Sequence, residues 1–177
     1  VAKYTDCQII GLDISSDALN TALDNASRLN LFNKAIFRKS DIFSNVKLGE
    51  TFDIIISNPP YIPQKEKGNI QTVKNLIQFC LDTKIILNHM STINVCGNYL
   101  VNNNIKYNFT ENDFFFGQNY ADNAYIYSKF EAERLIIENE YLGLNANIFR
   151  LGNLMGRIRD GKFQINKLDN AYYTRLL

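Results

Sequence analysis

The sequence predicts an α/β fold built on a mostly parallel sheet with flanking helices. Two observations favour this class. Short apolar runs of strand length alternate along the 177 residues with segments whose apolar residues recur at helical spacing. The hydrophobic fraction of 46% and the charged fraction of 21% are typical of a globular domain. The chain shows no repeat, and we expect strands joined by helices rather than an all-β or all-α arrangement.

The first half of the chain predicts three strands and one helix. Ser15 or Ser16 can cap the helix through a side-chain oxygen. Three consecutive isoleucines at 54–56 predict a strand that is covered on both faces. Two prolines then end the sheet, because proline lacks the N–H donor that a ladder needs. The expected elements are strands at 8–12, 35–37 and 52–57 and a helix from about 16 to 26.

The second half of the chain predicts two helices and two further strands. Between them lies a polar and aromatic segment at 98–123, which we interpret as either a substrate loop or a mobile stretch. His89, the one histidine of the chain, is expected to be a packed core residue. The expected elements are helices at 73–81 and 124–139 and strands at 84–90 and 145–150.

Charge and cysteine content exclude several classes of protein. Lys and Arg number 19 against 18 Asp and Glu, so the chain has no electrostatic footprint for nucleic acid or an anionic membrane. No apolar run has the length of a membrane helix. Three distant cysteines without a CxxC pair, and one histidine, argue against a zinc site or a disulfide framework. We therefore expect a cytoplasmic protein that binds no metal.

Acidic residues follow the first two predicted strands. Asp13 and Asp41 lie at carboxyl ends, where α/β sheets bind their ligands, and an acid at such a place commonly binds ribose hydroxyls. A helix cap is the alternative role for each of them.

The sequence Asn58-Pro59-Pro60-Tyr61 follows the third predicted strand. The prolines hold the loop rigid, so the Asn58 side chain and the Pro59 carbonyl can present two acceptors at fixed geometry. Such a pair can hold an NH2 group, and Tyr61 offers an aromatic face beside it. This arrangement suits methyl transfer to an amide or amino nitrogen, which depends mainly on positioning.

Residues 1–67 resemble the HemK-type release-factor glutamine N5-methyltransferases. The resemblance lies in Ile9 to Ser15, Ser40 to Phe43 and Ser57 to Pro63. It implies that Asp13 binds the ribose of S-adenosylmethionine and that Asp41 lies by the adenine. It also implies that Asn58, Pro59, Pro60 and Tyr61 bind the substrate, a protein glutamine such as that of a release factor. Nucleic-acid amino-methyltransferases share the Asn-Pro-Pro-Tyr core and are the alternative for this segment.

A second constellation lies on the predicted helix at 124–139. Tyr125 and Lys129 are four residues apart and share one face. An ammonium beside a phenol favours the phenolate, so the tyrosine can act as an acid or base near neutral pH. Thr92 or Ser91, which follow the strand at 84–90, can supply a hydroxyl to the same site. These groups suit carbonyl reduction by a nicotinamide cofactor.

Residues 68–177 resemble the thioester reductase domains of nonribosomal peptide synthetases, which are extended short-chain dehydrogenase/reductases. The stretches that carry the resemblance are Asn69 to Leu76, His89 to Gly97, Tyr125 to Glu133 and Phe149 to Gly156. It implies NADPH as cofactor and a carrier-protein-bound thioester as substrate. Thr92, Tyr125 and Lys129 would be catalytic, and Gly152 and Asn153 would lie near the nicotinamide.

Both families share a Rossmann-like fold and a glycine-rich cofactor loop, and neither loop is found in this sequence. We therefore expect an incomplete Rossmann-like domain, a fusion or fragment that combines the two segments. A sheet with three strands from the first segment and two or more from the second is conceivable. A non-catalytic product of truncation or gene fusion is the alternative.

Overall fold

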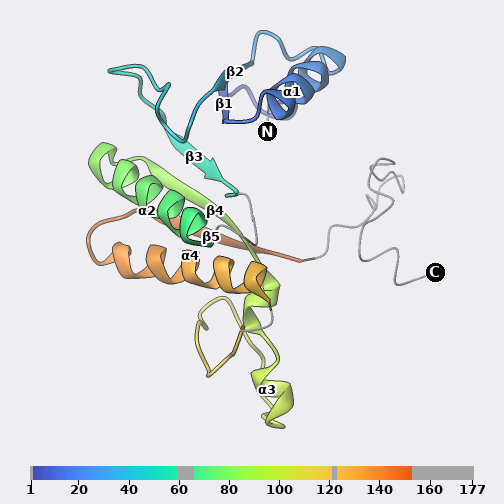
Figure 1. Cartoon of the computed structure of the whole chain (residues 1–177), viewed down its shortest axis with the longest axis vertical. Helices are drawn as coiled ribbons and strands as arrows, with labels where there is room; N and C mark the ends of the chain where they lie inside the picture. The colour runs from blue at the N-terminus through green and yellow to red at the C-terminus, as the bar shows by residue number, and fades with distance from the viewer. Residues whose placement is uncertain (1, 60–65, 121–122, 153–177) are drawn as a thin grey trace, which may run out of the picture.

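The computed structural model describes residues 2–59, 66–120 and 123–152 (Figure 1). All of the strand pairs are parallel, which confirms the predicted α/β class. The bounds of the predicted elements are confirmed to within a few residues, except that the helix predicted at 73–81 starts earlier. The elements in chain order are β1 (Ile9–Asp13), α1 (Ser16–Arg28), β2 (Ala35–Lys39), β3 (Ile54–Ser57), α2 (Glu66–Thr83), β4 (Ile86–Thr92), the 3-10 helix η2 (Ile93–Cys96), α3 (Tyr99–Asn102), α4 (Ala124–Glu140) and β5 (Ala146–Leu151).

The strands form two parallel sheets rather than one. β1 pairs with β2, and β4 lies between β3 and β5 in a second sheet. β3 comes from the first segment and β4 from the second, and Ile54 pairs with Ile86 at the start of their register. Among the described strands, β3 is therefore the one that links the two segments in a sheet, because β1 pairs with β2 and not with β3.

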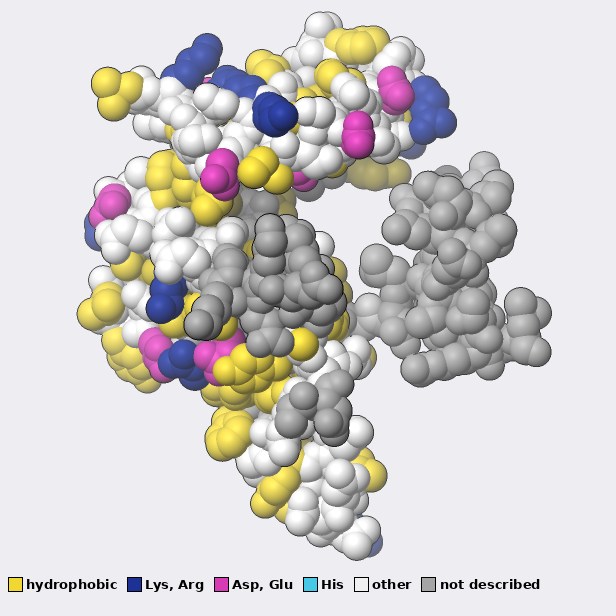
Figure 2. Space-filling view, viewed as in Figure 1, with side chains coloured by type: hydrophobic (Ala, Val, Ile, Leu, Met, Phe, Trp, Pro, Cys, Tyr) yellow, Lys and Arg dark blue, Asp and Glu magenta, His cyan; other side chains and the backbone are white. Residues whose placement is uncertain are grey.

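The main core lies between the three-stranded sheet and two helices. α2 and α4 pack against each other and cover one face of the sheet (Figure 1). Figure 2 shows that on the outer side of this layer basic side chains are interspersed with acidic ones, in keeping with the balanced net charge. The buried members of the core are Val73, Leu76, Ile77, Cys80, Leu87, Ala132, Leu135, Ile136 and Leu144.

The prediction that β3 is covered on both faces is wrong. Ile55 packs against the core, but Ile54 and Ile56 are 54% and 57% exposed. Phe149 and Leu151 of β5 are also exposed. Within the described residues α2 and α4 lie on one face only, so the alternate side chains of β3 and β5 remain open to solvent.

The described part of the predicted loop, residues 98–120, packs against α4 through aromatic side chains. The ring of Phe114 stacks on that of Phe130, with centroids 4.5 Å apart. Tyr120 and Val95 complete this second buried cluster. The Tyr120 hydroxyl donates a hydrogen bond to the Val95 carbonyl, which ties the segment to η2. No described helix has the length and apolarity that crossing a bilayer requires.

Candidate functional site

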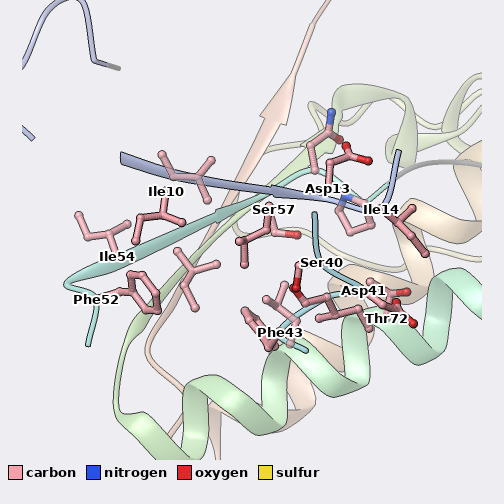
Figure 3. Close-up of a pocket in the computed structure, with 17 residues that line it drawn as sticks. Ile10, Asp13, Ile14, Ser40, Asp41, Phe43, Phe52, Ile54, Ser57 and Thr72 are labelled. Atoms are coloured by element: carbon pink, nitrogen blue, oxygen red, sulfur yellow. The ribbon is translucent and has the colours of Figure 1, made fainter. Parts of the chain in front are cut away.

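Polar residues at the carboxyl ends of β1, β2 and β3 line one cavity of about 390 Å³ (Figure 3). Figure 3 shows Asp13, Ser40, Asp41 and Ser57 toward one end of the cavity and Ile10, Phe52 and Ile54 toward the other. The cavity lies between the two sheets, and Thr72 and Leu76 of α2 complete its wall. Its volume falls in the range of small-molecule sites. The structure thus brings together the two carboxylates that the sequence singled out.

Asp13 lies in this cavity and also fixes the turn into α1. One carboxylate oxygen, Oδ1, accepts a hydrogen bond of 2.8 Å from the Ser15 backbone N–H. Ser15 in turn accepts from the Ala18 N–H at 3.3 Å and caps the helix, as predicted. Asp13 therefore serves as a turn residue, and its second carboxylate oxygen offers an acceptor to a ligand.

Asp41 is held in place by a tightly bonded loop after β2. Ser40 is buried, and its hydroxyl donates to the Ile42 carbonyl at 2.9 Å and accepts from the Asn45 N–H at 3.0 Å. Ile42 has a φ of +51°, which is rare for a β-branched residue. Such backbone strain persists where neighbouring bonds over-determine the conformation. These bonds hold the residue before Asp41 and the residue after it.

Lys129 of α4 reaches the end of β3. Its side chain is nearly excluded from solvent, at 5% exposure. The ammonium donates hydrogen bonds of 2.8 Å to Asn58 Oδ1 and of 2.8 Å to the Met90 carbonyl. Burial lowers the pKa of Lys129, while the negative charge of Glu133 raises it. The Asn58 oxygen, which the sequence assigned to a substrate amide, is thus engaged by an ammonium.

The other members of the second constellation lie close to Lys129 in the chain or the sheet. Tyr125 is half-buried and precedes Lys129 by about one turn of α4. Thr92 ends β4, two residues after Met90, and its hydroxyl accepts from the Asn94 N–H at 3.3 Å. Ser91 instead donates its hydroxyl to the buried carboxylate of Glu133. Of the two hydroxyls that the sequence left open, Ser91 is therefore committed to the core.

The sequence prediction missed a buried charge network beside this site. Glu133 is 0% exposed, and Arg150 of β5 donates to both of its carboxylate oxygens at 2.8–3.2 Å. Arg150 also donates to the Thr110 carbonyl at 3.2 Å. The spacing of Glu133 four residues after Lys129 places it on the same helix face, and that spacing was the available signal.

His89 lies in the core of the sheet, as predicted. It is 0% exposed, and both ring nitrogens lack a hydrogen-bond partner among the described residues. Burial, together with the positive charge of Lys129, lowers the pKa of His89 to about 4. The imidazole is therefore neutral at physiological pH.

The described residues fit the nicotinamide end of a dinucleotide cofactor but not its pyrophosphate. Lys129 and Tyr125 can face a ribose and a carbonyl, and Gly152 follows β5 and is exposed. A pyrophosphate cradle is not found in the described ranges. Gly11, in β1, is a packing glycine, because a Cβ there would lie 2.6 Å from the Phe37 ring. Three of the predicted site residues lie outside the described part of the chain, namely Pro60, Tyr61 and Asn153. The residues that the structure does describe contain no cluster of side chains that could hold a metal ion.

Comparison with known proteins assigns the longer part of the chain. Residues 60–176, more than half of the sequence, match the family model of the male sterility protein, an NAD-binding domain. The chain belongs to this NAD-binding family. Residues 1–84 of the same chain match a second family model, the methyltransferase small domain. The predicted boundary between residues 67 and 68 falls where the two matches overlap, and its exact position stays a prediction.

Curated relatives match the first segment. A release factor glutamine methyltransferase of Buchnera aphidicola is 52% identical over 58 residues, which are 33% of this chain and 20% of the relative. One of Rhodopirellula baltica is 40% identical over 65 residues, 37% of this chain and 22% of the relative. A ribosomal protein uL3 glutamine methyltransferase of Francisella tularensis is 40% identical over 63 residues, 36% of this chain and 20% of the relative. The chain thus spans about a fifth of the length of these relatives.

Solved structures resemble the whole chain. A thiolation-reductase di-domain of an archaeal non-ribosomal peptide synthetase has a TM-score of 0.75 and 24% identity, covering 98% of this chain and 52% of that one. The reductase domain of the aureusimine biosynthetic cluster has a TM-score of 0.74 and 21% identity, covering 96% and 48%. The likeness extends over the methyltransferase-like segment as well, so both segments take part in the fold that the chain shares with these structures. The chain combines a protein-glutamine methyltransferase-like segment with a thioester reductase-like segment, as predicted.

Proposed function

We propose that the chain is an NADPH-dependent reductase that acts on a thioester bound to a carrier protein. The observation that carries this proposal is the buried ammonium of Lys129, held at the ends of β3 and β4 about one turn after Tyr125. Membership in an NAD-binding family and the reductase fold support it. The free state of Cys7, Cys80 and Cys96 agrees with a reducing cytoplasm, where we place the protein.

Each residue has a distinct role in this proposal. Thr92 donates a hydrogen bond to the thioester carbonyl oxygen and orients it. Bound NADPH would supply the hydride that makes the carbonyl carbon tetrahedral. Tyr125 gives its proton to the oxygen, and Lys129 favours the resulting phenolate. When the carbon–sulfur bond then breaks, the hydroxyl proton passes to the departing sulfur and the aldehyde forms, while the Tyr125 phenolate regains a proton from solvent. One thioester, one NADPH and one proton thus give one aldehyde, one thiol and one NADP⁺.

Tyr125→Phe tests this role against a matched neighbour. We expect the rate of NADPH oxidation with an acyl-phosphopantetheine thioester to fall about 100-fold or more, because general acid catalysis contributes that much. Tyr127→Phe is the control, since Tyr127 lies two residues away on α4 and is 39% exposed. Equal rates for the two variants would contradict the proposal, and so would the absence of turnover in the parent chain, which would favour a non-catalytic product of fusion or truncation.

A second candidate function is binding of S-adenosylmethionine in the cavity of about 390 Å³. The placement of both Asp13 and Asp41 in its wall favours this function. Asp13 would accept from the ribose hydroxyls and Asp41 would lie by the adenine, with Asn58 and Pro59 holding a protein glutamine amide of a release factor. An amino group of a nucleic acid is the alternative acceptor.

Calorimetric titration with S-adenosylmethionine tests this second candidate. Asp13→Asn keeps an acceptor for the Ser15 N–H but removes the charge, so we expect about 10-fold weaker binding. Asp17→Asn is the control, because Asp17 lies exposed in the first turn of α1 and does not line the cavity. If neither the parent chain nor the control binds the cofactor, the cavity does not serve this function.

A further inference from the structure

The ammonium group of Lys129 contacts residues from both segments of the chain. Lys129 and Asn58 are 71 residues apart in sequence, yet Nζ and Oδ1 lie 2.8 Å apart. Asn58 lies outside the reductase-type family match, which begins at residue 60. The methyltransferase resemblance gave Asn58 a different task, the binding of a substrate amide. Neither the NAD-binding family match nor the methyltransferase resemblance therefore accounts for the contact between Asn58 and Lys129.

The surroundings of Lys129 make this contact consequential. A nearly buried ammonium needs acceptors for its N–H groups, because burial without hydrogen bonds disfavours the charged form. Asn58 and the Met90 carbonyl supply two neutral acceptors, one from β3 and one from β4. An ammonium has three N–H donors, and these two acceptors fix its position at the ends of the two strands.

The charged and titratable groups around Lys129 come from three elements. On α4, Glu133 follows by one turn and Tyr125 precedes by one turn. On β4, His89 is buried and neutral. On β5, Arg150 pairs with Glu133 and so balances its charge. The negative charge of Glu133 still raises the pKa of Lys129, but the groups that accept hydrogen bonds from the ammonium are Asn58 and the Met90 carbonyl.

We propose that Asn58 is a positioning residue of the reductase-type site, whose amide oxygen fixes the ammonium of Lys129 beside Tyr125. The site is then assembled from both segments, and the first segment contributes more than scaffold. The catalytic consequence of this role rests on the proposed reductase function. The effect of Asn58 on the pKa of Lys129 can be measured without enzymatic turnover.

Heteronuclear NMR of protein labelled at lysine Cε reads the titration of Lys129 directly. Asn58→Asp keeps the shape of the side chain and adds a negative charge, so we expect the pKa of Lys129 to rise by about 1 unit or more. Asn58→Leu removes the acceptor, so we expect the pKa to fall by about 1 unit. Asn88→Asp and Asn88→Leu are matched controls on β4, because Asn88 bonds to Asn147 rather than to Lys129.

Opposite shifts in the two Asn58 variants, with no shift in the Asn88 pair, support the inference. An unchanged Lys129 pKa in folded Asn58→Asp would overturn it, and this isosteric variant decides even if Asn58→Leu does not fold. In an active enzyme we expect the pH profile of kcat/KM to move in the same two directions. If the parent chain shows no reduction, the proposed function fails, while the Lys129 titration still decides the role of Asn58.

Discussion

At the scale of single residues, the site depends on charges that are withdrawn from water. Lys129 and Glu133 lie one turn apart on α4 and are 5% and 0% exposed. Each has polar partners from other strands, Asn58 and Met90 for the ammonium and Arg150 and Ser91 for the carboxylate. These partners offset part of the cost of burying a charge, and removing one of them leaves a buried charge uncompensated, which is costly. His89 is the exception, since neither ring nitrogen has a partner among the described residues.

His89 predicts an acid-sensitive fold. Its pKa is lowered from the ordinary 6.5 to about 4 in the folded chain. Between these values the unfolded chain binds a proton that the folded chain excludes, so stability is complete above pH 6.5 and falls as the pH drops toward 4. A shift of this size corresponds to about 3 kcal/mol once the window has been crossed.

Urea unfolding of the parent chain and of His89→Leu between about pH 7.5 and about pH 5 measures this loss. His89 is the one histidine, so the variant has no imidazole left to titrate. We expect its free energy of unfolding to stay nearly constant over this range. A loss in His89→Leu as large as in the parent chain would show that other groups cause the acid sensitivity. Glu50 does not contribute to a loss between about pH 7.5 and about pH 5, because its hydrogen bond from Arg38 lowers its pKa to about 2.

At the scale of elements, α4 connects the site to the rest of the fold. Glu133 joins α4 to β4 through Ser91 and to β5 through Arg150. Arg150 extends the connection to the segment at 98–123 through the Thr110 carbonyl and the Phe109 ring. The buried ion pair therefore adds to the aromatic contacts and to the Tyr120 hydrogen bond that hold this segment.

Arg150→Met tests how much the ion pair between Arg150 and Glu133 contributes to stability. The variant leaves Glu133 buried without its cation, so we expect it to lower the free energy of unfolding by about 3–5 kcal/mol. Arg134→Met is the matched control on α4, where Arg134 pairs with Glu131 and Glu138 at 39% side-chain exposure. We expect the control to cost about 1 kcal/mol or less. Equal losses in both variants would contradict a structural role for the buried pair.

Adding Glu133→Gln to Arg150→Met isolates the cause of the loss. The double variant no longer buries an unpaired charge, so we expect it to regain part of the stability that Arg150→Met loses. Additive losses from the two substitutions would mean that lost packing, rather than the unpaired carboxylate, is responsible.

Local patterns predicted the elements better than their environments. Ser15 identified the start of α1, and apolar spacing identified α4, because caps and periodicity depend on near neighbours in sequence. The three isoleucines of β3 predicted two covered faces, but a run of apolar residues does not reveal where helices pack. The contact of Asn58 with Lys129 could not be predicted from the sequence, for a different reason. It joins two segments whose resemblances, taken separately, assigned each residue to a different chemistry.

At the scale of the whole molecule, the methyltransferase-like segment takes part in the α/β fold that the chain shares with solved reductase domains. The segment gives β3 to the three-stranded sheet and Asn58 to the site, while β1 and β2 form a sheet of their own (Figure 1). The cavity between the two sheets carries Asp13 and Asp41. Of the residues that the sequence singled out, Asn58 from the first set and Lys129 from the second lie in contact at the ends of β3 and β4.

Transfer of deuterium from NADPH deuterated at C4 of the nicotinamide to an acyl-phosphopantetheine thioester tests the central claim most directly. Mass spectrometry of the products reads the outcome. We predict an aldehyde that carries one deuterium, formed together with free thiol by the parent chain and strongly reduced in Tyr125→Phe. A parent chain that forms no deuterated aldehyde, or that forms it equally well without the Tyr125 hydroxyl, would contradict the proposed reductase function.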